Sequence, residues 1–171
     1  WSETTEDETV NLKACSWEEK KGLGKPVTLA DTDAAEAFAV AGTDSKGRVW
    51  VSWQSFRAGE GDVYARFLDP KSGKWSKEIA VATQKGGDWA PSIAFDNKGN
   101  VWIAYDSSRG NEFNLNLARV DSDGKVKEFP IGHSPRYEAR ASITATAEGN
   151  GFWIAAERGK LKHGLDYRGH G

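Results

Sequence analysis

The chain has 171 residues, about one domain, and its 23 Lys and Arg residues nearly balance 25 Asp and Glu residues, giving a net charge of −2. This balance excludes the basic excess of nucleic-acid-binding proteins and gives no electrostatic attraction to anionic membranes. The single cysteine excludes an intrachain disulfide framework, and the longest apolar stretch, residues 37–41, is too short for membrane insertion. The chain has neither a starting Met nor a signal segment, so we expect a processed or excised piece of a longer protein.

The sequence repeats with a period of about 50 residues. The segment 44–53 (DSKGRVWVSW) returns as 96–105 (DNKGNVWIAY) and, in degraded form, as 148–155 (EGNGFWIA). β-branched and aromatic residues fill each copy, and Asp, Gly and Lys turn residues bound it, which is typical of β-hairpins. We expect the repeated Trp50, Trp102 and Trp153 to lie in the core. Asp44 and Asp96 are ordinary turn residues, with calcium binding as the alternative.

Each period predicts four antiparallel strands, at 38–43, 48–54, 62–68 and 76–82 and again at 91–96, 100–106, 114–120 and 125–131. This pattern predicts an all-β fold of four-stranded propeller blades. Residues 9–30 give an outer half blade, 31–82 and 83–132 two whole blades, and 133–171 an inner half blade with a tail. Since three blades are too few for a ring, the remaining blades come from a missing segment, another chain or further copies of this one.

The phrase Asp-x-Lys-Gly-x-Val-Trp-Val-x-Trp-x-Ser-x-Arg-x-Gly at 44–59, followed by Gly-Asp-Val-Tyr at 61–64, resembles the blade repeat of TolB-like propellers. It is similar, too, to the Asp-box of sialidases, whose Asp-to-Trp spacing is one residue shorter. The prominent Trp of the second strand resembles the repeats of sensor-type and lyase-type bacterial propellers. The resemblance spans residues 36–158 and implies a propeller, a fold that hosts both binding modules and enzymes. It also implies a bacterial protein with a periplasmic or extracellular location.

The loops 54–61, 106–113 and 157–162 are expected on one rim of the propeller, with the blade-connecting loops 31–37, 83–90 and 132–140. Arg57, Arg109 and Arg158 would then stand at equivalent positions, where three guanidiniums suit an acidic ligand such as a carboxylate or sulfate. The alternative, which their repetition favours, is that each arginine pairs with an acid inside its own blade.

Trp89 and Tyr137 lie at the ends of blade-connecting loops, where they serve either sugar stacking or packing between blades. Asp106 and Glu157 follow second strands and are the carboxylates available for acid–base chemistry on that rim. His163 and His170 in the C-terminal tail match no metal-ligand spacing. The sequence therefore predicts no cofactor, no metal site and no catalytic residue.

The leading hypothesis is a non-catalytic propeller module that binds a protein partner or another ligand, with Arg57, Arg109, Arg158, Trp89, Tyr137 and Asp106 as candidate contacts. The alternative is a glycan-binding or glycan-cleaving propeller, related in its chemistry to sialidases or polysaccharide lyases. Possible ligands are thus an acidic small molecule or a glycan, and no contact with nucleic acid is expected.

Overall fold

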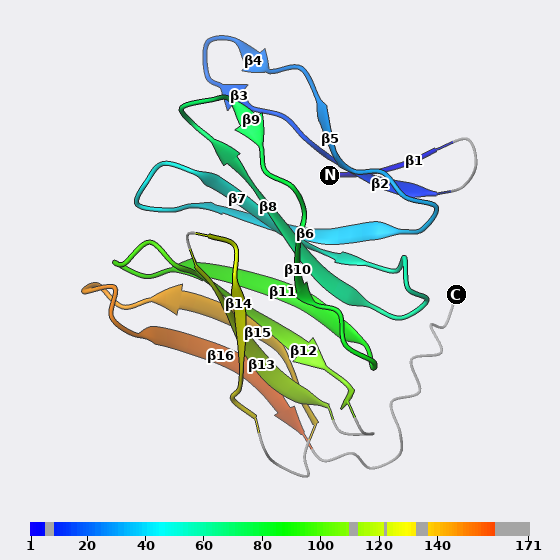
Figure 1. Cartoon of the computed structure of the whole chain (residues 1–171), viewed down its shortest axis with the longest axis vertical. Helices are drawn as coiled ribbons and strands as arrows, with labels where there is room; N and C mark the ends of the chain where they lie inside the picture. The colour runs from blue at the N-terminus through cyan, green and yellow to red at the C-terminus, as the bar shows by residue number, and fades with distance from the viewer. Residues whose placement is uncertain (6–8, 110–112, 122, 133–136, 160–171) are drawn as a thin grey trace.

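The computed structural model describes residues 1–5, 9–109, 113–121, 123–132 and 137–159, and it is built of antiparallel sheets with no α-helix among these residues. None of the described residues forms a helix that could cross a membrane. The predicted strands are all present, within a few residues of the expected ends. Figure 1 shows the sheets stacked face to face in chain order, with the N-terminal sheet at one end and the C-terminal hairpin at the other.

The stack contains two four-stranded blades between two smaller sheets. The first blade joins β6 (Glu36–Thr43), β7 (Val49–Ser55), β8 (Asp62–Asp69) and β10 (Ile79–Ala82), and the short β9 (Lys74–Trp75) also pairs with β8. The second blade joins β11 (Asp88–Phe95), β12 (Val101–Ser107), β13 (Asn114–Val120) and β14 (Val126–Pro130). In each blade the chain crosses from the inner strand to the outer strand through consecutive antiparallel pairs.

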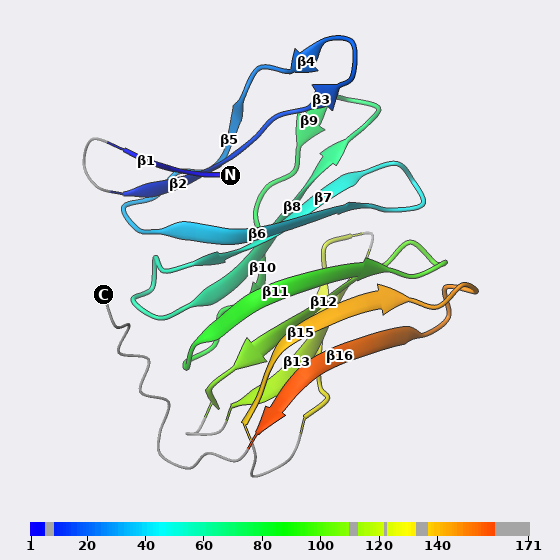
Figure 2. The same ribbon diagram turned by 180° about the vertical axis from the view of Figure 1, so that it is seen from behind.

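The end sheets are incomplete blades. At the N-terminus, β2 (Val10–Ala14) pairs with β5 (Val27–Ala30) and with β1 (Ser2–Thr4), and β3 (Trp17–Glu18) forms a small hairpin with β4 (Gly22–Leu23). At the C-terminus, β15 (Tyr137–Ala145) and β16 (Phe152–Gly159) form the C-terminal hairpin. The view from behind in Figure 2 shows the same stacking order.

Three apolar clusters hold neighbouring sheets together. The first lies between the N-terminal sheet and the first blade, the second between the two blades, and the third between the second blade and the C-terminal hairpin. Both faces of β7 and β12 are therefore covered, which is why these strands are apolar on both sides rather than alternating.

The turn between the first two strands of each blade is organised by an aspartate, which is buried in the first blade and partly buried in the second. Asp44 accepts hydrogen bonds from Trp50 Nε1 at 2.9 Å, from Arg48 Nε at 2.6 Å and from the backbone N–H groups of Lys46 and Arg48. Burial acts to raise the pKa of Asp44, but these bonds outweigh it and hold the pKa below its usual value. Asp96 accepts the equivalent bonds in the second blade. Each aspartate therefore fixes its turn to the tryptophan six residues later in the chain.

The three repeated tryptophans differ sharply in exposure. Trp50 is fully buried and Trp102 is partly buried, but 74% of Trp153 is exposed. The prediction that Trp153 lies in the core is wrong, because no sheet formed by the described residues packs on this side of the C-terminal hairpin. The repeat itself is preserved there, so the exposure reflects position in the stack.

Replacing Asp44 with Ala should lower the free energy of unfolding by about 3 kcal/mol, because it leaves Trp50 Nε1 buried without its acceptor and the buried Arg48 guanidinium without its counter-charge. Urea unfolding followed by tryptophan fluorescence measures the change. Asp121→Ala is the matched control, since Asp121 caps an exposed turn through backbone N–H groups alone. Equal losses for the two variants would contradict the structural role of Asp44.

Candidate functional site

One end of the stack gathers the starts of the inner strands and the ends of the second strands. The strand pairing sets this arrangement, since Glu36 lies opposite Ser55 and Asp88 lies opposite Ser107. We call this end the loop rim. It comprises the described residues among 54–62 and 106–114, which lead from second to third strands, among 30–36, 82–90 and 130–138, which join the sheets, and 157–159 at the end of the hairpin. It carries the described candidate residues that the sequence predicted, so their contacts decide what it can bind.

Glu36 is the buried centre of the first blade's rim. Its side chain is fully buried, although it carries a carboxylate at the start of a strand. Four side chains donate to its two oxygens: Thr32 at 2.6 Å, Trp53 at 2.6 Å, Ser55 at 3.0 Å and Arg57 at 3.0 Å. The carboxylate is therefore fully used in holding the rim together and offers no acceptor to a ligand.

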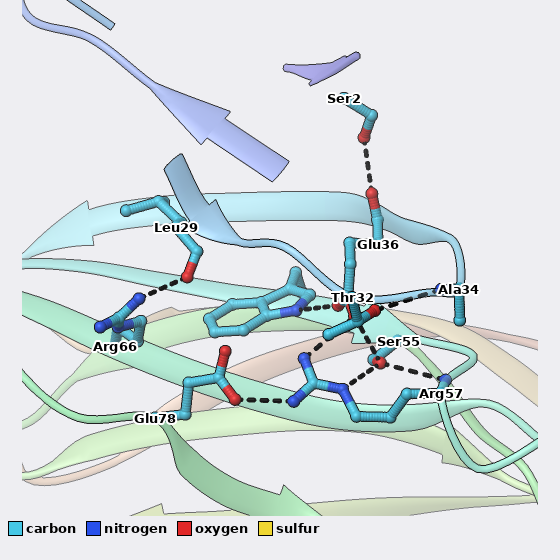
Figure 3. Close-up of polar contacts among 10 residues, drawn as sticks. Ser2, Leu29, Thr32, Ala34, Glu36, Ser55, Arg57, Arg66 and Glu78 are labelled. Atoms are coloured by element: carbon cyan, nitrogen blue, oxygen red, sulfur yellow. Dashed lines mark hydrogen bonds and ion pairs between the residues drawn. The ribbon is translucent and has the colours of Figure 1, made fainter. Parts of the chain in front are cut away.

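Arg57 links this centre to the outer strand of the same blade. Figure 3 shows its guanidinium between Glu36 and Glu78, which accepts at 2.7 Å. The guanidinium also lies over the Tyr64 ring, 4.2 Å from the ring centroid. Arg57 is thus fixed on two acids and an aromatic face, as the structural interpretation of the repeated arginines expects.

The second blade repeats the pattern with different side chains. Arg109 pairs with Asp88 at 3.1 Å and with Glu128 at 2.8 Å, and the Tyr105 hydroxyl donates to Glu128 at 2.6 Å. Burial raises the pKa of Asp88, although hydrogen bonds and the Arg109 charge oppose that rise. The guanidinium again joins the inner strand to the outer strand of one blade.

Arg158 does not occupy the loop position of the other two arginines. It lies within β16 opposite Glu138, in the register that Ser55 and Ser107 hold in the blades. Its guanidinium pairs with Glu138 at 3.1 Å. The prediction of three equivalent loop arginines is therefore wrong for Arg158, because Arg158 follows Trp153 by five positions, whereas each loop arginine follows its tryptophan by seven.

Asp106 forms a clamp between sheets. It is 7% exposed, and its two oxygens accept the backbone N–H of Arg140 at 2.8 and 2.9 Å. Burial raises its pKa to about 6, even though backbone N–H groups of Arg140 and Ala141 favour the charged form. Gln54 holds the same place in the first blade and accepts the N–H of Ala90 at 3.3 Å.

Arg140 and Ala90, whose N–H groups these side chains bind, lie in a bulge that recurs in each inner strand. Phe38, Ala90 and Arg140 all have positive φ, at 53°, 49° and 56°, although none is glycine. Each sits where the register of its inner strand shifts. The side chain of Arg140 also pairs with Glu157 at 3.3 Å, so both carboxylates considered for acid–base chemistry, Asp106 and Glu157, contact one residue. By accepting the backbone N–H of Arg140, Asp106 has a defined structural role.

Trp89 and Tyr137 are brought together by a third aromatic residue. Phe113 stacks on Trp89 with ring centroids 5.9 Å apart and planes at 18°, and it lies 5.9 Å from Tyr137 at 51°. We call these three residues the aromatic row, and all three are partly exposed. The sequence analysis missed Phe113, whose only signal was an aromatic residue at the end of a rim loop.

Two glycines make room for the Trp89 ring. A Cβ atom at Gly61 would lie 2.3 Å from Trp89 Nε1, and one at Gly87 would lie 2.0 Å from Trp89 Cζ2. No ordinary side chain fits at either place, so the ring lies directly on the backbone of two rim loops. Trp89 is therefore held in place by the shape of the rim.

The aromatic row breaks the repeat, whereas the acid–arginine contacts follow it. In the strand register Trp89 corresponds to Ala37 of the first blade and Ala139 of the C-terminal hairpin. The row is thus specific to the junction between the second blade and the hairpin. Among the described residues no cluster of His, Cys, Asp and Glu is arranged to hold a metal ion, and His163 and His170 lie outside those residues.

Comparison with known proteins identifies the fold. No protein-family model and no curated protein matches the chain. A thermostable family-43 glycoside hydrolase is 11% identical with a TM-score of 0.59, over 92% of this chain and 60% of its own. An endo-arabinase from Bacteroides thetaiotaomicron is 13% identical with a TM-score of 0.50, over 77% of this chain and 56% of its own. A family-25 polysaccharide lyase, an ulvan lyase bound to -[GlcA(1-4)Rha3S]-, is 14% identical with a TM-score of 0.51, over 93% of this chain and 52% of its own.

These neighbours are propeller-type folds, and the predicted all-β propeller is confirmed. The chain spans between 52% and 60% of the length of each of them. At such low identity the likeness establishes the fold alone. The resemblance to TolB-like and Asp-box repeats stays a prediction.

Replacing Arg57 with Ala should lower the free energy of unfolding by about 3 kcal/mol, because the buried Glu36 carboxylate then loses its counter-charge. Lys21→Ala is the control, since Lys21 and Glu18 form an exposed pair whose loss should cost less than about 1 kcal/mol. Chemical denaturation measures both. Arg57→Lys should fall between wild type and Arg57→Ala, because Lys keeps the charge without the fork of donors. An unaffected Arg57→Ala variant would leave the guanidinium free for ligand binding.

Asp106 should make the protein less stable as pH rises from about 4 to 7. Because its folded pKa of about 6 lies above the ordinary value of 3.8, the native state binds more protons than the unfolded state in that interval. Asp106→Asn should remove up to about 3 kcal/mol of this pH dependence. Urea unfolding at four pH values measures it, with Asp121→Asn as an exposed control. An unchanged pH profile in Asp106→Asn would assign the dependence to another group.

Proposed function

We propose that the loop rim binds a glycan chain, with the aromatic row as its stacking surface. The observation that carries this proposal is that Trp89, Phe113 and Tyr137 form a partly exposed row that the repeat does not require. Residues needed only for packing between blades recur in every copy, as Trp50 and Trp102 do. Trp89, by contrast, corresponds to alanine in the first blade and in the hairpin.

The chemistry of the row suits sugar rings. The C–H groups of a pyranose or furanose pack on aromatic faces, and a row of rings extends that contact along a polymer. Because Gly61 and Gly87 hold the Trp89 ring in place, little side-chain entropy is lost when a ligand binds. Arg57 and Arg109 form ion pairs with acids of their own blades. Stacking on the aromatic row, rather than contacts with these arginines, therefore supplies the affinity for the glycan.

The comparisons support this choice over a protein-interaction module. The neighbours include glycoside hydrolases and a polysaccharide lyase, all of which act on glycans by their descriptions. The proposal takes from them only the ligand class. The first probes are arabinan, chosen because one neighbour is an endo-arabinase, and a polymer of the glucuronic acid and sulfated rhamnose unit bound by the lyase.

Cleavage is a second candidate, and the raised pKa of Asp106 favours it. A carboxyl group with a pKa of about 6 is about half protonated at pH 6, and Asp106 could donate its proton to a leaving group only after releasing the Arg140 N–H. Product release from either probe, lost in Asp106→Asn while glycan binding persists, would support this candidate. Binding without product release would support a binding module.

Trp89→Ala should weaken glycan binding at least about tenfold, because it removes the ring at one end of the row. Isothermal titration with arabinan and with the sulfated glucuronic acid polymer measures the affinity. Trp17→Ala is the control, since Trp17 is equally aromatic but lies 66% exposed on the β3–β4 hairpin. Circular dichroism confirms that both variants stay folded. Equal affinity of the two variants, or no binding of any probe by wild type, would overturn the proposal.

A further inference from the structure

Two exposed surfaces lie on different sheets of the stack, on sides that face away from each other. One is the outer side of the C-terminal hairpin, where Trp153 is 74% exposed. The other is one side of β6 at the start of the first blade, where Ala39, Ala41 and Thr43 are exposed. Figure 1 shows the second blade lying between the first blade, to which β6 belongs, and the C-terminal hairpin. Both surfaces belong to strands whose equivalents are covered elsewhere in the chain.

The register of the repeat shows what covers Trp153 in its equivalents. Trp50, Trp102 and Trp153 pair with the same position of their inner strands, namely Gly42, Ala94 and Thr144. The inner strand of the following sheet packs on that tryptophan. Ile93 and Phe95 belong to the cluster of Trp50, and Ala141 and Ile143 belong to the cluster of Trp102.

The exposed side of β6 is the matching surface. Ala41 pairs with Val51 as Ile93 pairs with Ile103 and Ile143 with Ile154, so Ala41 occupies the position that covers a tryptophan of the preceding sheet. The preceding sheet, however, supplies only two outer strands, β2 and β5, and the short β1. Ala41 therefore lacks the inner strands that its equivalents pack against.

We propose that these two surfaces dock on one another between two copies of the chain. Trp153 of one copy packs on Ala39 and Ala41 of the second, and β16 pairs with the edge of β2 to complete a four-stranded blade. Two such contacts close a ring of two copies with six blades, within the four to eight of known propellers. This proposal is independent of glycan binding.

The register of the shared blade follows from the first blade. Leu12 pairs with Ala30 and Lys13 with Thr28, as Val63 pairs with Ala82 and Tyr64 with Ala80, so Cys15 corresponds to Arg66. Arg66 lies opposite Val51, whose equivalent in the hairpin is Ile154. Cys15 of one copy therefore lies opposite Ile154 of the other.

The β1 strand covers part of the edge that β16 needs. Ser2, Glu3 and Thr4 pair with Leu12, Asn11 and Val10, where the end of β16 belongs in the shared blade. Strand β1 must leave β2 when the ring closes. Removing residues 1–5 should therefore strengthen the association of the two copies.

Light scattering and native mass spectrometry of the full chain at about 1 to 100 μM test the proposal. These concentrations detect dimers with dissociation constants in the micromolar range or below. We expect a defined dimer. Trp153→Arg should raise the dissociation constant at least about 100-fold, as loss of a central interface aromatic does, without loss of circular dichroism. Trp17→Arg, on another exposed tryptophan, should leave the dimer unchanged. A monomer at every concentration, or growth without a limiting mass, would overturn the two-copy ring.

Covalent trapping tests the register independently. Ile154→Cys should form an interchain disulfide with the native Cys15 on mild oxidation, because directly opposite residues of an antiparallel pair lie within disulfide reach. Non-reducing electrophoresis would then show a covalent dimer. Glu148→Cys, in the exposed turn of the same hairpin, should remain largely uncrosslinked. Equal crosslinking of the two variants, or none in Ile154→Cys, would contradict the proposed pairing.

Discussion

Every complete sheet of this protein is apolar on both faces and must be covered twice. That constraint produces the stack, because burying one face of a blade leaves the other face to the next one. Trp50, buried between the two blades, and Trp153, exposed on the last strand, are the same repeated residue with and without a following sheet. The fold is therefore extended by repetition. Apolar surface that is exposed on its end sheets would be buried, with a gain in stability, if further strands packed on it.

The polar interior of the loop rim is held by acids and arginines that the repeat supplies in each sheet. Glu36 with Arg57, and Asp88 with Arg109, join inner to outer strands at the end of the stack where the loops gather. Because buried carboxylates need counter-charges, these guanidiniums stabilise the fold and contribute little to the choice of ligand. They instead provide a rigid frame on which the unrepeated residues are placed.

The aromatic row is the feature that this frame positions. Trp89 rests on two glycines, Phe113 comes from the neighbouring loop, and Tyr137 begins the next inner strand. Its place at the junction of the second blade and the hairpin depends on the packing between those sheets. In a ring of two copies the row would occur twice on one rim, at opposite positions, which would favour multivalent contact with a long polymer.

The sequence by itself determined the strands, the blade period and the propeller class, because turn residues and β-branched runs act locally and recur in register. It also indicated the pairing of the repeated arginines within blades. Only the tertiary structure decided that Arg158 lies in a strand, that Phe113 joins Trp89 to Tyr137, and that Trp153 is exposed. The place of Arg158 follows from the spacing between Trp153 and Arg158, which is two residues shorter than in the blades. The other two outcomes depend on contacts between separate loops and on which sheets cover each other among the described residues, and such non-local terms leave no periodic trace in the sequence.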